Sequence, residues 1–264
     1  MPRTLVALFL LACTPAAPTT STMTETNFAR YIALGDSISI DIYPSADIAR
    51  RYPGRASTDR VGAVSLLVRN DDRLWPEFRG RDLRTLQPSL RFDARRDDLT
   101  ADGATTESVL RQVERIERSD EPTLVTITAG GNDLLGYIGS PGPSPSPAIA
   151  GRLRTAIGRV LELRPNAVVL VGTVYDPSDG TNRLPGYTRA LDREAEWLAE
   201  YNDLVRRLVA SDRRLRLADV HRHFLGHGLT VPEDERWYLR ESIIEPSARG
   251  GSEVRRVWLE TLRF

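Results

Sequence analysis

The sequence predicts an α/β fold in which a five-stranded parallel sheet lies between two layers of helices, a three-layer α/β/α sandwich. Short, nearly continuous apolar runs alternate along the chain with longer segments whose apolar residues recur every three or four positions. This alternation is typical of parallel sheets covered on both faces. The chain has 264 residues, 41% of them hydrophobic, which is enough for one sizeable core, so a single domain is expected.

The strands are expected at the apolar runs and the helices at the periodic segments. The predicted strands are residues 31–34, 123–128, 167–174 and 215–218, with a weaker candidate at 98–101. The predicted helices are residues 61–74, 105–118, 148–163, 191–209 and 252–262. Right-handed crossovers between parallel strands place the carboxyl ends of the strands, and the loops that follow them, at one edge of the sheet.

A serine follows the first predicted strand directly. Residues 31–34 lead into Gly35-Asp36-Ser37, which places the Ser37 hydroxyl at the sheet edge where open α/β folds bind their ligands. The run at residues 123–128 is followed by Gly130-Gly131-Asn132-Asp133, which adds a side-chain amide at a neighbouring strand end. A hydroxyl nucleophile and an amide donor at one edge indicate acyl transfer.

These two stretches resemble the first and third motifs of the SGNH hydrolases, also called GDSL hydrolases. Gly103 matches the glycine that this family places between them. The resemblance runs from about residue 29 to the C-terminus and implies the flavodoxin-like strand order 2-1-3-4-5. It also implies that Ser37 is the nucleophile and that the Gly103 N–H and the Asn132 side chain form the oxyanion hole. Asp36 and Asp133 are expected to bond nearby backbone groups.

The last motif of that family, Asp-x-x-His, is altered in this chain. The corresponding residues are Ser242 and Glu245, followed by Pro246 and the predicted helix at 252–262. The chain therefore resembles an atypical member, with a glutamate where the family has its catalytic histidine. Fold and mechanism have to be argued separately.

Two residues are candidates for the base that accepts the serine proton. The chain has three histidines, His221, His223 and His227, all after the last predicted strand. In the first hypothesis Ser37 attacks, His227 accepts the proton and Glu245 orients the imidazole. In the second, Glu245 is itself the base, which requires apolar surroundings to raise its pKa by roughly two units. The alternative to both is an inactive descendant, a binding module for envelope glycans.

Other candidate site residues follow from their places in the loops. Asp41, Tyr175 and Asp176 are candidate substrate contacts because each follows a predicted strand at the same edge. The spacing of His221 and His223 suits a metal only with a third ligand, which is not evident, so no metal and no cofactor are expected. The formal net charge is zero, which gives no indication of a nucleic-acid partner.

The N-terminal residues are expected to direct the protein to the cell envelope. Residues 1–12 have the order of a charge followed by an apolar run that is typical of a signal peptide, and the sequence around Cys13 resembles a bacterial lipobox. Residues 13–28 are then a flexible tether and residues 29–264 the hydrolase-like domain. The membrane would be contacted only through a lipid on Cys13. Translation from Met23 would instead leave a cytoplasmic protein.

Together these observations predict a serine hydrolase that cleaves a carboxylic ester through an acyl-enzyme at Ser37. The resemblance favours small acyl groups, such as acetyl on carbohydrate, or simple lipid esters. The expected partner is a small-molecule or glycan ester substrate, and the protein is expected to be a monomer without nucleic acid.

Overall fold

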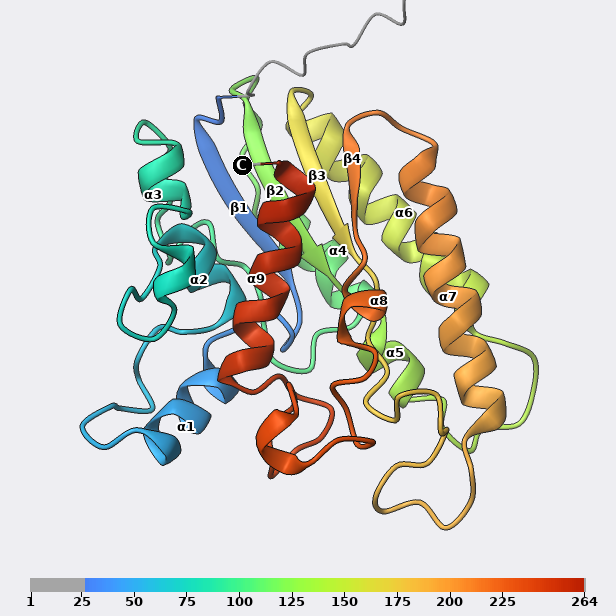
Figure 1. Cartoon of the computed structure of the whole chain (residues 1–264). Helices are drawn as coiled ribbons and strands as arrows, with labels where there is room; N and C mark the ends of the chain where they lie inside the picture. Colours follow the sequence, from blue (N-terminus) through green and yellow to red (C-terminus); the bar gives the residue numbers. More distant parts are fainter. Residues whose placement is uncertain (1–26, 264) are drawn as a thin grey trace, which may run out of the picture.

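The computed structural model describes residues 27–263 and contains a parallel β-sheet with helices on both faces (Figure 1). The strands lie in the order β1-β2-β3-β4, with bounds β1 Arg30–Gly35, β2 Thr123–Thr128, β3 Ala167–Gly172 and β4 Leu215–Ala218. Each neighbouring pair is parallel, so the carboxyl ends of the four strands meet at one edge. The predicted α/β class and parallel sheet are confirmed.

The prediction of a fifth strand at residues 98–101 is wrong for the described residues. This segment runs beside the free edge of β1, where the Ala33 N–H donates to the Asp97 carbonyl at 2.8 Å and the Leu99 N–H donates to the Ala33 carbonyl at 2.9 Å. Only an isolated bridge, Ala33 with Asp98, forms there. The Asp98 carboxylate accepts the Thr100 hydroxyl at 2.6 Å, and such local bonds compete with regular pairing. The segment still occupies the place that the order 2-1-3-4-5 gives to its outer strand.

The helices fall into two layers, one on each face of the sheet. Their bounds are α1 Ile42–Arg51, α2 Ala63–Val68, α3 Leu83–Leu86, α4 Thr106–Val113, α5 Gly131–Leu135, α6 Ser146–Leu163, α7 Asp192–Ala210, α8 Val220–Phe224 and α9 Ala248–Leu262, with short 3-10 helices at Pro76–Phe78 and Glu233–Glu235. Helix α9 packs with α1 and α2, and α6 packs between α4 and α7. Figure 1 shows α9 and α2 in front of the sheet and α4 and α6 behind it.

The alternation of side chains along the strands divides the core between the two faces. Tyr31 and Ala33 of β1 face the layer of α2 and α9, where Trp258 is fully buried. Ile32 and Leu34 of β1 face the layer of α4, α6 and α7. Both faces of the sheet are covered, which explains why the strands read as continuous apolar runs.

The signal peptide at residues 1–12, Cys13 and nearly all of the predicted tether lie outside the described residues, so these assignments stay predictions. Within residues 27–263 no helix is both long enough and apolar enough to cross a bilayer.

Candidate active site

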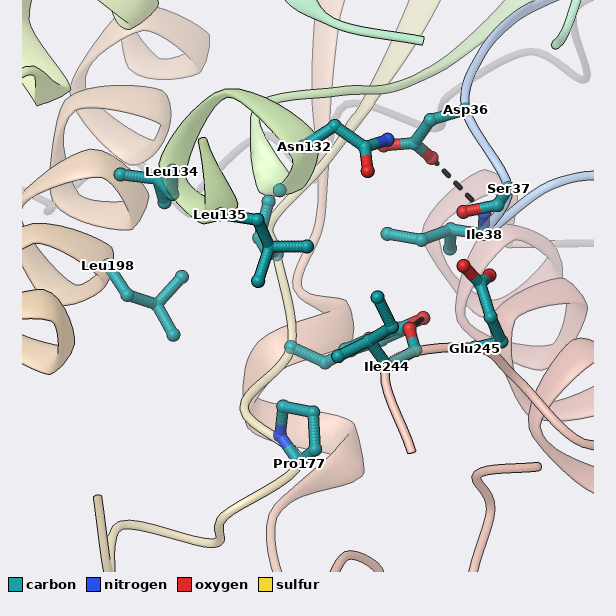
Figure 2. Close-up of a pocket in the computed structure, with 13 residues that line it drawn as sticks. Asp36, Ser37, Ile38, Asn132, Leu134, Leu135, Pro177, Leu198, Ile244 and Glu245 are labelled. Atoms are coloured by element: carbon teal, nitrogen blue, oxygen red, sulfur yellow. Dashed lines mark hydrogen bonds between the residues drawn. The ribbon is translucent and has the colours of Figure 1, made fainter. Parts of the chain in front are cut away.

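Segments that follow β1, β2, β3 and β4 line a pocket with a volume of about 100 Å³. Its polar lining comprises Asp36, Ser37, Asn132 and Glu245. Figure 2 shows the Glu245 carboxyl group pointing toward Ser37, with Asn132 across the pocket. The structure therefore brings together three residues that the sequence indicated separately, although they lie in distant parts of the chain.

The turn that carries Ser37 is held closely against β2 and α4. Gly35 has a φ of +131°, and a Cβ there would lie 2.2 Å from the Thr128 carbonyl oxygen, so only glycine fits. The Gln112 side chain accepts the Gly35 N–H at 2.8 Å and donates to the Gly35 carbonyl at 2.9 Å. Ser37 follows this fixed point by two residues and is 5% exposed. Its hydroxyl is thus presented to the pocket and shielded from bulk water.

Asn132 is positioned by a second close approach. Gly130 has a φ of +104°, and a Cβ there would lie 2.3 Å from the Tyr201 ring, whose hydroxyl donates to the Ala129 carbonyl at 2.8 Å. The Asn132 amide nitrogen donates to the Ala104 carbonyl at 3.0 Å. An amide nitrogen carries two hydrogens, which leaves a second N–H for a ligand. Gly103, with a φ of +66°, is the residue before Ala104.

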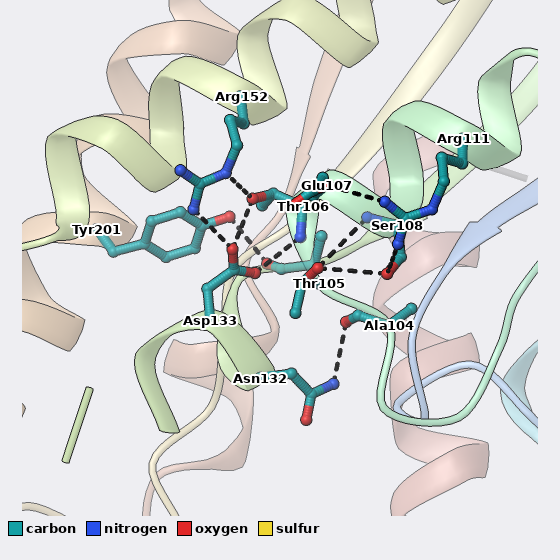
Figure 3. Close-up of polar contacts among 11 residues, drawn as sticks. Ala104, Thr105, Thr106, Glu107, Ser108, Arg111, Asn132, Asp133, Arg152 and Tyr201 are labelled. Carbon is teal, nitrogen blue, oxygen red and sulfur yellow. Dashed lines mark hydrogen bonds and ion pairs between the residues drawn. The ribbon is translucent and has the colours of Figure 1, made fainter. Parts of the chain in front are cut away.

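Asp133 joins the loop of Asn132 to the loop of Gly103. Its carboxylate accepts the Thr106 N–H and the Thr106 hydroxyl, each at 2.7 Å, and an Arg152 N–H at 2.9 Å (Figure 3). The Thr106 N–H is a first-turn donor of α4, which has no partner inside the helix. Asp133 therefore fixes the relative positions of the two expected oxyanion donors, consistent with its expected structural role.

Glu245 is placed by the short segment before α9. Its carbonyl accepts the Leu239 N–H at 2.8 Å, and the Ser247 N–H donates to the Trp237 carbonyl at 2.9 Å. Gly250 allows this contact, because a Cβ there would lie 2.0 Å from the same carbonyl oxygen. Glu245 is 6% exposed, and its Oε2 is buried without a hydrogen-bond partner among the described residues. A carboxylate so placed lacks much of the solvation that favours its charged form.

Burial raises the pKa of Glu245 to about 7; the Ser37 hydroxyl acts in the opposite direction, and the carboxyl groups of Asp102 and Asp36 add to the rise. Burial also raises the pKa of Asp36 to about 6. The Asp36 carboxylate accepts the Ile38 N–H at 3.2 Å and so braces the Ser37 turn. The Asp102 carboxylate accepts the exposed Tyr43 hydroxyl at 3.1 Å. A carboxyl group that titrates near neutral pH thus lies beside the serine hydroxyl.

The three histidines do not line this pocket. The His227 ring stacks on Trp237 with centroids 3.6 Å apart and an interplanar angle of 5°. His221 Nδ1 lies 3.0 Å from the Val174 carbonyl oxygen, and His223 Nε2 lies 2.9 Å from Glu253 Oε2. Burial lowers the pKa of His227, and His223 lowers it further. The arrangement with His227 between Ser37 and Glu245 is therefore not what the structure shows.

Of the candidate substrate contacts, only Tyr175 lines the pocket, and its hydroxyl donates to the Ile244 carbonyl at 2.7 Å. The Asp41 carboxylate accepts the Gly62 N–H at 2.7 Å and the Ser65 hydroxyl at 2.8 Å. The Asp176 carboxylate accepts the Ser178 and Gly180 N–H groups, each at 2.8 Å. Asp41 thus binds the start of α2, and Asp176 is used within its own loop. Within residues 27–263, no group of three or more His, Cys, Asp or Glu side chains is arranged to hold a metal ion.

The sequence did not reveal the apolar side of the pocket. Leu134, Leu135, Leu198 and Ile244 line it. Leu198 belongs to the periodic pattern of α7, where nothing in the sequence distinguishes a pocket residue from a core residue. Gln112 was missed for the same reason, because it is a polar residue inside an amphipathic helix.

The chain is similar to known ester hydrolases. The model of the GDSL-like lipase/acylhydrolase family matches residues 33–250. No curated protein matches the sequence.

Solved structures with the same fold include three esterases and lipases. An extracellular lipase from Streptomyces rimosus is 20% identical, with a TM-score of 0.54 over 88% of this chain and 99% of that one. Phospholipase A1 from Streptomyces albidoflavus is 19% identical, with a TM-score of 0.57 over 89% and 99%. A variant of an acetyl xylan esterase from Geobacillus stearothermophilus is 15% identical, with a TM-score of 0.56 over 89% and 95%. At these identities the likeness shows the fold.

Proposed function

Because the chain belongs to the GDSL-like lipase/acylhydrolase family, we propose that it is a serine esterase in which Ser37 forms the acyl-enzyme and Glu245 is the general base. The family and the esterase and lipase neighbours support ester hydrolysis in general. The observation that carries the finer proposal is the pairing of the Ser37 hydroxyl with a buried carboxyl group whose pKa is raised to about 7. The substrate proposed is a carboxylic ester with a small acyl group.

The reaction would proceed in two halves. Ser37 Oγ attacks the ester carbonyl carbon while its proton passes to the Glu245 carboxylate, and the carbonyl oxygen becomes an oxyanion held by Asn132 and nearby backbone N–H groups. The bond to the alcohol then breaks, and the departing oxygen takes the proton from Glu245. Water next attacks the acyl-enzyme, gives a proton to Glu245, and the acid leaves as Ser37 regains that proton. Glu245 returns to its starting state in each half.

A base with a raised pKa predicts a definite dependence on pH. Glu245 accepts a proton only when ionised, so kcat/KM should rise about tenfold per pH unit below about pH 7 and level off above it. Asp102 carries a negative charge that raises this pKa, so Asp102→Asn should move the midpoint of the profile to lower pH. The profile is measured with a p-nitrophenyl ester between about pH 5 and about pH 9. An unchanged midpoint in the variant would assign the titration to a group remote from Asp102.

The alternative is a glycan-binding module without turnover, and the absence of a histidine from the pocket lining favours it. A fluorophosphonate probe separates the two, because it reacts only with an activated serine. We expect one adduct, located by mass spectrometry on the peptide that contains Ser37, together with turnover of short-chain esters. A protein that binds acetylated glycans but gives neither adduct nor turnover would be the binding module.

A further inference from the structure

The pocket continues beyond Ser37 as an apolar passage. On the side away from the polar groups it is lined by Leu134 and Leu135 of α5 and by Leu198 of α7, with Pro177 and Ile244 along the way. Figure 2 shows Leu198 on the far side of the pocket from Ser37 and Glu245. The passage therefore has a polar, reactive end and an apolar end lined by Leu198 of α7.

This division fixes how an ester would lie. The carbonyl carbon has to meet Ser37 Oγ, with its oxygen near the Asn132 amide, so one half of the ester enters the passage. A sugar hydroxyl placed among Leu135, Leu198 and Ile244 would lose its hydrogen bonds to water without replacement, which is costly. An unbranched hydrocarbon chain has no such cost and gains from leaving water. The apolar end thus suits the acyl chain.

An exposed polar pair near Glu245 suits the alcohol half. The Tyr43 hydroxyl donates to the Asp102 carboxylate at 3.1 Å, and Asp102 lies close enough to Glu245 for its charge to raise the pKa of that carboxyl group. Exposed hydroxyl and carboxylate groups can hydrogen-bond to a hydrated alcohol. The two halves of the substrate are therefore recognised by opposite chemistries.

Building on the proposed acyl transfer at Ser37, we propose that the passage takes an unbranched acyl chain longer than acetyl and that Leu198 is the specificity-determining residue that limits its length. At roughly 10–15 Å³ for each water-sized group, about 100 Å³ holds several more groups than the single methyl of an acetyl chain. An acetyl group would leave most of this space unfilled.

The chain-length profile of hydrolysis tests the proposal. With p-nitrophenyl esters from acetate to decanoate, kcat/KM should rise about fourfold per added methylene until the passage is full. Leu198→Ala should move the optimum to chains about two carbons longer. Leu198→Phe should lower hexanoate hydrolysis roughly tenfold or more while sparing acetate.

Leu204→Ala is the matched control for these variants. Leu204 lies on the same helix and is half-buried like Leu198, yet it does not line the pocket. Its removal should change the melting temperature as Leu198→Ala does but leave the optimal chain length unchanged. The same shift of optimum in both alanine variants would show a general loosening of α7 and overturn the role given to Leu198.

A binding measurement separates failure of the pocket from failure of the enzyme. In Ser37→Ala, hexanamide should raise the melting temperature more than acetamide at equal concentration, and the added Leu198→Phe substitution should remove the difference. If the protein prefers hexanamide to acetamide but never hydrolyses esters, the proposed esterase function would be overturned and the acyl-binding role of the pocket would stand. If the protein hydrolyses esters and neither Leu198 variant alters the chain-length profile, the role given to Leu198 would be overturned and the proposed esterase function would stand.

Discussion

Replacing Ser37 by alanine is expected to lower kcat for ester hydrolysis by roughly 10³-fold or more, to near the rate without protein. The variant has no oxygen to form the acyl-enzyme, and the remaining oxyanion donors cannot substitute for a missing nucleophile. The measurement is hydrolysis of a p-nitrophenyl butanoate ester, followed by fluorophosphonate labelling. Because Ser37 lies on the surface of a pocket, the loss of one hydroxyl should leave the melting temperature nearly unchanged.

Ser39→Ala is the control, because it removes a hydroxyl from the same turn. The Ser39 hydroxyl makes a 2.7 Å hydrogen bond with the Thr128 hydroxyl and does not line the pocket. We expect it to lower the free energy of unfolding by about 1 kcal/mol while most of the activity remains. Equal loss of activity in both variants, or hydrolysis that survives Ser37→Ala, would contradict the assignment of Ser37 as nucleophile.

The sequence was sufficient to predict the part of the site that depends on the sheet. In a parallel sheet the residues after each strand meet at one edge, so Gly35-Asp36-Ser37 and Asn132 could be placed together from apolar runs alone. Gly35 and Gly130, which belong to these two motifs, adopt positive φ values and pack against Thr128 and Tyr201. These features depend on topology and on short-range sterics.

The position of the base could not be predicted in the same way. His227 and Glu245 both follow β4, and the path of the chain between them depends on contacts distant in sequence. Asp179 accepts the N–H groups of Gly226 and Gly228 at 3.0 and 2.9 Å, which holds His227 in its stack on Trp237. In the sequence, Asp179 stands in Asp176-Pro177-Ser178-Asp179-Gly180, a stretch typical of a turn, which gives no sign of this long-range contact. A tertiary contact therefore keeps His227 outside the pocket lining, which supports the proposal of Glu245 as the base.

The missing fifth strand has a similar cause. The segment 97–101 bonds to β1, but Asp97 pairs with Arg30 and Asp98 bonds Thr100 within its own turn. Short edge segments with charged side chains pair weakly, and their extent is set by neighbours that the sequence does not reveal. The segment nevertheless leads to Gly103 and Ala104, and the Ala104 carbonyl accepts the Asn132 amide at 3.0 Å.

Glu245→Gln is expected to lower kcat/KM by roughly 10³-fold at pH 8, whereas His227→Ala should stay within about twofold of the unaltered protein. Glutamine has nearly the same shape as glutamate but cannot accept the Ser37 proton. His227 is stacked on Trp237 outside the pocket lining, so its loss should affect packing more than rate. Both variants are assayed with the same short-chain ester as Ser37→Ala.

Stability against pH shows whether Glu245→Gln acts through chemistry or through the fold. The folded-state pKa of Glu245, about 7, lies above its ordinary value of 4.5, so the protonated form is favoured by folding. That contribution is complete below about pH 4.5 and is lost as the pH rises through about 7. The glutamine variant stays neutral throughout, so its melting temperature at pH 8 should match or exceed that of the unaltered protein. An inactive but fully stable Glu245→Gln would identify the carboxylate as the base, whereas a rate that falls only in His227→Ala would restore the imidazole to that role.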